Sequence, residues 1–349
     1  MGVLIGGWWP ITMDVIELER FSLSSPLGIG ANYEVYAAVD RETGKDVVLK
    51  RPWAQTIRTG QSRHIDEQSA RVIELHRSLA GVVPHIATLV GYTERVRHDR
   101  YFGDAFTQDY YVLVEERAPG VPLVADIKDK FRGVPIGLAQ NLFALYPLVP
   151  GALAGTPRIF EQILDVEEAF TRLDHLIMDL RPQNVFFDPQ RGEITIIDIG
   201  TSVDLRTAPG PRPTPDMHDC LAELCKFYLE PQSPPTQLKG YRDPYGMGPA
   251  LGFTKELERM IQACTGLASG PLRDLAVEML QRLQRRDYGA VAPFRRDLHQ
   301  YFALLDERNR NLQDFSGLIE VWRQGMELLR EQYWRKYRFD PDADLAPYA

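Results

Sequence analysis

The sequence contains little cysteine. Its 349 residues include three cysteines, Cys220, Cys225 and Cys264, and no C-x-x-C pair. This number and spacing exclude a disulfide framework. Cys220 and Cys225 lie in an apolar helical run, so we expect buried thiols. Together these features indicate a protein of a reducing cytoplasm.

The sequence also lacks the segments that direct or hold a chain at a membrane. Its first residues have neither the basic region nor the apolar core of a signal peptide. Residues 133–157 carry no charge, but polar residues, prolines and glycines interrupt them, and a spanning helix needs about twenty predominantly apolar residues. We therefore expect no transmembrane segment. An insertion at 134–154 would pack on the rest of the fold or form a surface for a partner.

Positive charge is not in excess. The chain has 40 Lys and Arg residues against 48 Asp and Glu residues, which gives a net charge of −8. This balance argues against a general nucleic-acid-binding protein. The apolar fraction of 44% and the charged fraction of 25% are typical of globular proteins, and the chain is long enough to bury a core.

What the sequence does contain is a motif of three polar side chains with defined spacing. Asp179 begins the run D-L-R-P-Q-N, Asn184 ends it, and Asp198 begins D-I-G fourteen residues later. Residues 185–197 read as a two-stranded hairpin between them. Such a hairpin would return Asn184 and Asp198 to one end, where they could hold Mg²⁺ while Asp179 orients a hydroxyl nucleophile. The motif therefore predicts a phosphoryl-transfer site.

A glycine-containing loop precedes this motif. Gly28 and Gly30 lie in the run L-G-I-G-A-N-Y-E-V-Y at 27–36, between two β-like segments. Tyr33 occupies the position of the third glycine in the G-x-G-x-x-G pattern. The strand-loop-strand setting nevertheless suits a loop whose backbone approaches phosphates. We call residues 27–36 the glycine loop.

A lysine at the end of a strand follows the glycine loop. The run V-V-L-K ends in Lys50, which we expect to bind nucleotide phosphates. Such a lysine needs an acidic partner, and the helix-like segment 65–79 offers Glu67 and Glu74, seven residues apart and on nearly the same face. We favour Glu74 because of its spacing to the strand region at 84–89.

The order of these features resembles the eukaryotic-type Ser/Thr protein kinases. The glycine loop, V-V-L-K, the helix glutamate, L-V-E-E at 113–116, D-L-R-P-Q-N and D-I-G follow one another as in that family, from about Phe21 to about Leu283. The resemblance implies an α+β, bilobal fold with a small antiparallel β-sheet N-lobe that carries one helix, and a larger, mainly α-helical C-lobe. The expected parts are an N-terminal extension at 1–20, the N-lobe at 21–117, the C-lobe at 118–290 and a helical C-terminal extension at 291–349.

The resemblance also implies ATP and Mg²⁺ as cofactors. ATP would lie between the lobes, with the adenine bonded to the backbone of Glu115 and Arg117 and with Val114 at the gatekeeper position. The apolar side chains expected around the adenine are those of Val35, Val48 and Phe186. The catalytic set would be Lys50, Glu74, Asp179 and Arg181, and the metal ligands would be Asn184 and Asp198.

Three departures from the family pattern bear on function. Ile177-Met178-Asp179 stands in place of H-R-D, which removes the arginine that usually binds a phosphorylated activation loop. Arg181 stands where these kinases have lysine, and it can still stabilise the transferring phosphoryl group. Only eighteen residues separate Asp198 from Asp216, which the resemblance makes a hydrogen-bonding partner of the catalytic loop. The proline-rich stretch at 208–215 between them is expected to be extended.

The C-terminal third shows helical patterns. Apolar stripes predict amphipathic helices at 253–266 and 272–283, which resemble the closing helices of the kinase C-lobe. A further stripe at 314–337 predicts a tail helix that packs back on the C-lobe or, alternatively, docks a partner.

These features predict an ATP- and Mg²⁺-dependent phosphotransferase that acts on Ser/Thr hydroxyls of an unidentified protein. Because the shortened segment after Asp198 lacks the part that cradles a peptide, a small-molecule kinase of the aminoglycoside- or choline-kinase type is an alternative. A nucleotide-binding pseudokinase that serves as a scaffold is another. The five groups that bind nucleotide and metal or orient the nucleophile are all present, which favours catalysis.

Overall fold

The computed structural model describes the chain in separate stretches: residues 14–30, 32–53, 55, 62–79, 83–103, 108–123, 156–180, 184–188, 190–206, 215–228, 253–266, 268–311, 337 and 343. Several expected features lie outside them, namely Arg181, the insertion at 134–154, the proline-rich stretch up to residue 214, and the tail helix apart from Tyr337. Contacts divide the chain into two compact units, Met1–Arg117 (unit 1) and Ala118–Ala349 (unit 2). The division lies at the residue where the expected first lobe ends.

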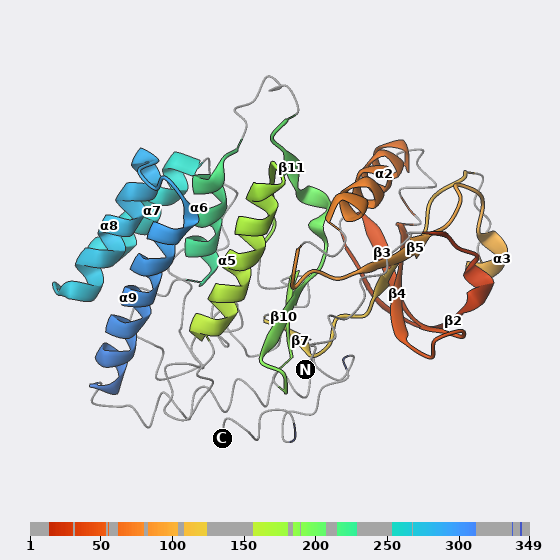
Figure 1. Ribbon diagram of the computed structural model, residues 1–349, viewed down its shortest axis with the longest axis horizontal. Helices are drawn as coiled ribbons and strands as arrows, with labels where there is room; N and C mark the ends of the chain where they lie inside the picture. Colours follow the sequence, from red (N-terminus) through yellow and green to blue (C-terminus); the bar gives the residue numbers. More distant parts are fainter. Residues whose placement is uncertain are drawn as a thin grey trace, which may run out of the picture. The chain divides into compact units, whose positions relative to one another are not determined.

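The described residues form a mixed α+β structure, as the fold class predicted (Figure 1). Unit 1 holds a six-stranded sheet in the order β1-β5-β6-β4-β3-β2. Strands β2 to β6 pair antiparallel, and β1 joins β5 in parallel at one edge. The strands are β1 (Asp14–Val15), β2 (Phe21–Ile29), β3 (Tyr33–Asp40), β4 (Asp46–Pro52), β5 (Leu89–Tyr92) and β6 (Leu113–Glu116). The helical elements are η1 (Leu18–Arg20), α2 (Ser62–Leu79) and α3 (Asp99–Phe102).

A tight turn joins β3 to β4, the two strands that carry several of the expected nucleotide-binding residues. Gly44 in this turn has φ 71°, a left-handed conformation that glycine adopts readily. The Asp40 carboxylate accepts a hydrogen bond from Thr43 Oγ1 at 2.7 Å and forms an ion pair with Arg20 at 2.6 Å. The Arg20 guanidinium holds the pKa of Asp40 well below its usual range. Asp40 therefore ties the end of β3 to the turn and to η1.

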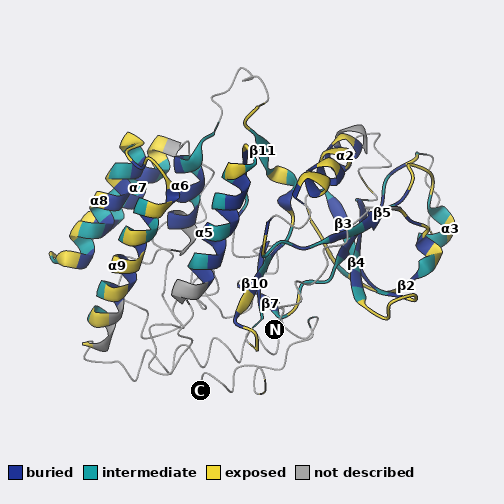
Figure 2. Ribbon diagram, in the orientation of Figure 1, coloured by how far each residue is buried: buried dark blue, intermediate teal, exposed yellow. Residues whose placement is uncertain are grey.

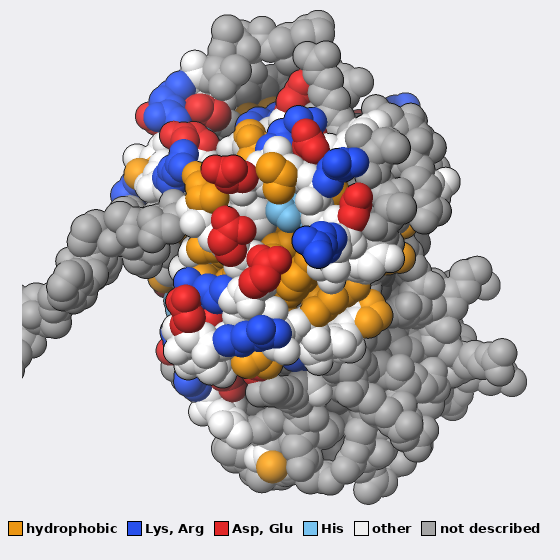
Figure 3. Space-filling view, turned by 90° about the vertical axis from the view of Figure 1, so that its right-hand side faces the viewer, with side chains coloured by type: hydrophobic (Ala, Val, Ile, Leu, Met, Phe, Trp, Pro, Cys, Tyr) orange, Lys and Arg blue, Asp and Glu red, His pale blue; other side chains and the backbone are white. Residues whose placement is uncertain are grey.

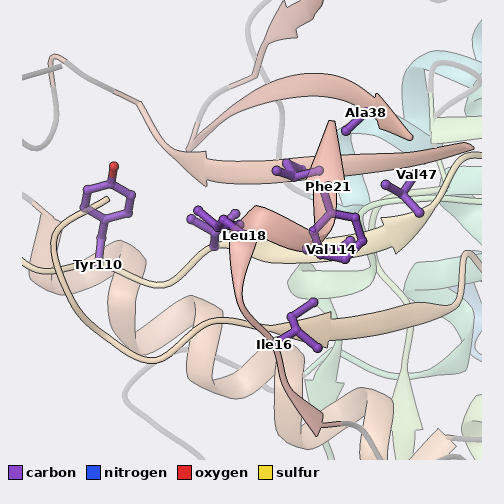
Figure 4. Packing of buried hydrophobic residues seen from close by; sticks show 9 residues of the cluster. Ile16, Leu18, Phe21, Ala38, Val47, Tyr110 and Val114 are labelled. Atoms are coloured by element: carbon purple, nitrogen blue, oxygen red, sulfur yellow. The ribbon is translucent and has the colours of Figure 1, made fainter. Parts of the chain in front are cut away.

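The two faces of this sheet bury different side chains. On one face, α2 covers an apolar cluster made of Tyr33, Ile65, Val72, Ile73, Leu89 and Leu113. On the other face lies a second cluster, made of Ile16, Leu18, Phe21, Ala38, Val47, Leu49, Tyr110, Val112 and Val114 (Figure 4). Successive residues of a strand point to opposite faces, and cross-strand partners share a face. The register therefore assigns to the α2 face the side chains of Val35, Val48, Lys50 and Glu115.

The described part of unit 2 combines helices with two small sheets. The helices are α5 (Thr156–Arg172), α6 (Met217–Tyr228), α7 (Phe253–Thr265), α8 (Pro271–Arg285) and α9 (Val291–Arg310), with the short turn η4 (Ile199–Thr201). One sheet has the order β10-β9-β7, and the other pairs β11 with β8. Their strands are β7 (Val121–Pro122), β8 (His175–Leu176), β9 (Val185–Asp188), β10 (Glu193–Ile196) and β11 (Val203–Asp204).

The apolar patterns predicted several of these helices. The stripes at 253–266 and 272–283 form α7 and α8, whose inward side chains are buried (Figure 2). The expected helix at 65–79 forms most of α2, and Cys220 and Cys225 are buried in α6, as predicted. Among the described helices, none is long and apolar enough to cross a membrane.

Candidate functional site

A buried ion pair lies at the centre of the expected nucleotide-binding residues in unit 1. Lys50 Nζ lies 2.8 Å from Glu115 Oε2, and 9% and 4% of the two side chains are exposed. The register explains the pair: Lys50 faces Leu113 and Val48 faces Glu115 on neighbouring strands, so both side chains project from the α2 face. Burial makes each charge dependent on the other, because an unpaired charge in this environment is strongly unfavourable.

Helix α2 contributes an imidazole close to this pair. His76 is 4% exposed, and its burial lowers its pKa to about 4. The Glu115 carboxylate acts on this pKa in the opposite direction, and the Lys50 ammonium adds to the lowering. The His76 side chain is therefore neutral at physiological pH.

The predicted pairing of Lys50 with Glu74 is wrong. The Glu74 side chain is 76% exposed and forms an ion pair with Arg77, the residue three positions later, at 3.4 Å. Positions seven residues apart in a helix share a face. Glu67 is exposed as well, so both candidate glutamates belong to the outward side of α2. The carboxylate beside Lys50 comes from a strand instead.

Helix α2 makes two side-chain polar contacts with the glycine loop. Asn32 Nδ2 donates to Gln68 Oε1 at 2.8 Å, and the hydroxyls of Tyr33 and Ser69 lie 2.9 Å apart. Tyr33 is 6% exposed and belongs to the apolar cluster under α2. The tyrosine that stands in place of the third glycine is therefore a core residue.

Gly28 and Gly30 are exposed in this loop. A Cβ atom at Gly28 would meet nothing within 4 Å, and one at Gly30 would meet only the Tyr33 carbonyl oxygen at 3.6 Å, an ordinary contact. Packing within the described residues therefore does not demand glycine at either position. The absence of side chains leaves this backbone open to a ligand.

Two apolar side chains adjoin the Lys50–Glu115 pair on the α2 face. Val35 faces Lys50 across β3 and β4, and Val48 faces Glu115 across β4 and β6. Both valines are partly exposed, whereas Leu49, which points to the opposite face, is fully buried. Val35 and Val48 therefore offer apolar surface beside a buried cation.

The structure corrects the expected contacts of the strand 113–116. Val114, the expected gatekeeper, points away from Lys50 into the second cluster (Figure 4). Glu115 pairs with Val48 on one side and with Leu89 on the other, so the sheet engages the backbone that was expected to bind adenine. The Arg117 N–H donates to the Asp46 carbonyl at 3.3 Å. Val114 therefore does not share the sheet face on which Lys50 lies.

In unit 2, the predicted hairpin is confirmed. Strands β9 and β10 pair antiparallel, with Val185 opposite Ile196, and the Ile197 N–H donates to the Asn184 carbonyl at 2.8 Å. Asn184 therefore precedes β9 at the end of the hairpin where β10 runs out towards Asp198. The Asn184 Nδ2 donates to the Asp179 carbonyl at 3.1 Å, which brings the D-L-R-P-Q-N run to the same end.

Asp198 has an unusual backbone conformation. Its φ of 59° and ψ of 51° are left-handed, and it begins the turn η4 with its side chain exposed. Asp and Asn tolerate this region better than most residues, yet it remains unfavourable by about 1 kcal/mol or more. Such strain is frequent where a side chain is aimed for function.

The donor set at this end of the hairpin fits Mg²⁺. Because Asn184 Nδ2 is committed to the Asp179 carbonyl, the amide has its Oδ1 left as an acceptor. Asn184 and Asp198 would supply two oxygen ligands, which suits a cation that keeps waters and takes the remaining ligands from phosphates. Within the described residues, no group of three or more His, Cys, Asp and Glu side chains could hold a metal. A metal here would therefore depend on its phosphate ligand.

The structure also gives the contacts of Phe186 and Asp216, two further residues of unit 2 to which the sequence analysis assigned roles. Phe186, expected beside adenine, is 9% exposed, and its ring meets that of Tyr337 edge-on at 5.5 Å between centroids. Asp216, expected to hold the catalytic loop, caps α6 by accepting a hydrogen bond from the His218 N–H at 2.8 Å and forms an ion pair with Arg286. Arg181 is not among the described residues.

A buried acid behind Asp179 was not predicted. Glu167 of α5 is 1% exposed, and burial raises its pKa to about 8. Its neighbour Cys220 donates to the sulfur of Met178, the residue before Asp179, at 3.3 Å. The sequence held a signal for it: Glu167 follows Ile163 by four residues and Leu164 by three, inside the apolar stripe of α5.

The charges on the surface of unit 1 are mixed. On the face shown in Figure 3, Lys and Arg side chains alternate with Asp and Glu side chains. The described residues of this face therefore present no field of one sign for a nucleic acid.

Comparisons with models of known protein families and with curated proteins found no match for this chain.

Proposed function

We propose that this protein is an ATP- and Mg²⁺-dependent phosphotransferase with a bilobal, protein-kinase-like fold, in which unit 1 is the smaller lobe and unit 2 the larger. The observation that carries the proposal is the β9–β10 register, with Asn184 and Asp198 at one end of the hairpin and the Asn184 amide on the Asp179 carbonyl. An acid, an amide and a second acid in this arrangement are the groups that phosphoryl transfer to a hydroxyl uses.

Unit 1 would bind the nucleotide. Lys50 would contact the phosphates with an ammonium that is buried and paired, hence held in one place. The exposed backbone at Gly28 and Gly30 would cover the phosphates. Val35 and Val48 would pack against the base, which takes apolar contacts on its faces.

Unit 2 would supply the chemistry. When bound, Mg²⁺ offsets the charge that develops on the phosphate oxygens during transfer. Asn184 Oδ1 and the Asp198 carboxylate would hold it. Asp179, which is half-buried, would orient the acceptor hydroxyl and receive its proton, and Arg181 would stabilise the transferring phosphoryl group.

The acceptor we propose first is a Ser or Thr hydroxyl of a protein. A small-molecule alcohol is the second candidate, because few residues lie between the hairpin and α6. Strand β11 binds β8 directly after η4, and α6 begins at Met217, so about a dozen residues are left to shape a peptide site.

The test is phosphate transfer from γ-labelled ATP by the purified chain with Mg²⁺. One reaction contains the chain alone, a second a cell lysate, and a third a panel of small alcohols and aminoglycosides. We expect labelled product in at least one of them, and protein or small-molecule product decides between the acceptors. A purified chain that neither binds MgATP by calorimetry nor transfers label would contradict the proposal.

A further inference from the structure

The partner of Lys50 comes from the sheet and not from a helix. Lys50 of β4 and Glu115 of β6 lie on neighbouring strands with their charged atoms 2.8 Å apart, and both side chains are more than nine-tenths buried. Cross-strand geometry is fixed by the backbone ladder, so this pair is set by the sheet itself. Its position does not require a particular placement of α2.

On this basis, and on the function proposed above, we propose that Glu115 is the positioning residue of Lys50 in phosphoryl transfer. Glu115 holds the ammonium where it contacts the nucleotide phosphates, the role that sequence patterns give to a glutamate of the following helix. Glu74 of that helix is exposed and bonded to Arg77. The lysine is therefore in place whenever the sheet is folded.

The groups around the Lys50–Glu115 pair are consistent with a positioning role for β6 and a separate role for α2. His76 of α2, which is buried and neutral, interacts electrostatically with both charges. The polar contacts of α2 with the glycine loop are those of Gln68 with Asn32 and of Ser69 with Tyr33. The helix thus supports the loop, and the strand β6 supports the lysine.

The experiment measures steady-state turnover of MgATP by variants of the whole chain. For Glu115→Gln we expect kcat about 100-fold lower and KM changed by no more than about threefold, because a misplaced lysine is felt mainly in the transition state. Glu116→Gln is the matched control: it removes the next carboxylate of the same strand, which pairs with the exposed Lys45 on the other face, and it leaves kcat unchanged. Glu74→Gln also leaves kcat unchanged.

A double variant tests whether Glu115 acts through Lys50. In a Lys50→Met background, Glu115→Gln should lower kcat no further, because residues that act as a unit are not additive. A folded Glu115→Gln variant with wild-type kcat, or a Glu74→Gln variant that loses as much, would overturn the positioning role.

A third variant keeps the test valid if Glu115→Gln does not fold. Glu115→Asp retains the charge but withdraws it by one methylene, and kcat should fall about tenfold. Wild-type kcat for Glu115→Asp would overturn the proposal in that case. If the wild-type chain itself does not bind or turn over MgATP, the proposed function fails. Normal turnover by both wild type and Glu115→Gln removes only the positioning role.

Discussion

The two units hold their candidate functional groups in different ways. In unit 1, Lys50 and Glu115 are buried within a sheet, and each neutralises the charge of the other. In unit 2, Asp198 is exposed and Asp179 half-buried at the end of a hairpin. The Asn184 side-chain amide bonds to the Asp179 carbonyl, and the Ile197 N–H bonds to the Asn184 carbonyl.

This difference predicts how each unit responds to substitution. A buried pair is part of the folded structure, so removing either member lowers the free energy of unfolding. Asp198 is exposed and Asp179 is half-buried at a loop end, so we expect their replacement to affect chemistry while the fold remains. The predictions below test this contrast in order of decreasing effect.

The largest effect is expected when one member of the buried pair is removed. Lys50→Met leaves Glu115 buried without its ion-pair partner and should lower the free energy of unfolding by about 3–5 kcal/mol. Asp179→Asn at the loop end should change it by less than about 0.5 kcal/mol. Denaturant unfolding of both variants checks this, and equal stability of the two would show that the contrast between the units is wrong.

The pH dependence of the stability of unit 2 should reflect the titration of Glu167. Burial raises the pKa of Glu167 to about 8 in the folded chain, above that of an unfolded glutamate. The folded state therefore binds more protons than the unfolded state between about pH 4.5 and 8, and stability is lost as pH rises through this window. The loss should amount to about 4 kcal/mol between pH 5 and 8.5.

Glu167→Gln should remove this dependence. The partly exposed neighbour Glu168, which pairs with Arg295, gives the control Glu168→Gln, which should keep it. Melting temperatures across the pH range measure both. An unchanged slope in Glu167→Gln would mean that Glu167 is ionised in the folded chain at neutral pH.

Through His76, the stability of unit 1 should fall as the pH falls, the opposite direction to the effect of Glu167. Burial lowers its pKa to about 4, so the unfolded state binds the additional proton as pH falls from about 6.5 to 4. The chain should lose about 3 kcal/mol of stability across that window. His76→Gln should abolish the loss of stability as the pH falls, while the loss of stability that Glu167 causes as the pH rises should remain. A variant that loses stability in acid as the wild type does would exclude His76 as the cause.

A small effect on stability is expected at Asp198. Asn adopts the left-handed backbone at least as readily as Asp, so Asp198→Asn should preserve stability or raise it by up to about 1 kcal/mol. The same substitution removes a charge from the proposed Mg²⁺ site, and under that proposal the affinity for MgATP should fall while the affinity for metal-free ATP does not. Calorimetric titrations of ATP with and without Mg²⁺ measure the two affinities separately. A large loss of stability would place Asp198 among the structural residues.

Much of unit 2 could be predicted because its signals are local. The turn that ends at Gly192 and the runs of β-branched and aromatic residues on either side of it predict the hairpin. Apolar residues with a period of 3.6 predict α7 and α8. The location of Asn184 and Asp198 at one end of the hairpin follows from the register, since strands joined by a short turn return to the same end.

The partner of Lys50 could not be predicted for two physical reasons. Strand β6 is buried on both faces, so V-L-V-E has no alternation to show whether Val114 or Glu115 lies on the same face of the sheet as Lys50, and a shift of one residue exchanges them. Helix α2 buries polar side chains, among them Gln68, Ser69 and His76, so polarity does not identify its outward face. Both ambiguities are settled only by tertiary packing.

The most direct test of the account compares phosphate transfer by the wild type and by Asp179→Asn, at equal concentration and with γ-labelled ATP, Mg²⁺ and the acceptor found in the transfer assay. Because Asp179 is assigned to the nucleophile, the variant should lose at least about 100-fold in transfer rate, whereas its affinity for MgATP and its melting temperature stay at wild-type values. Glu193→Gln, on the exposed side of the same hairpin, should transfer phosphate like the wild type. Equal transfer by the wild type and Asp179→Asn would contradict the assignment on which the proposed chemistry rests.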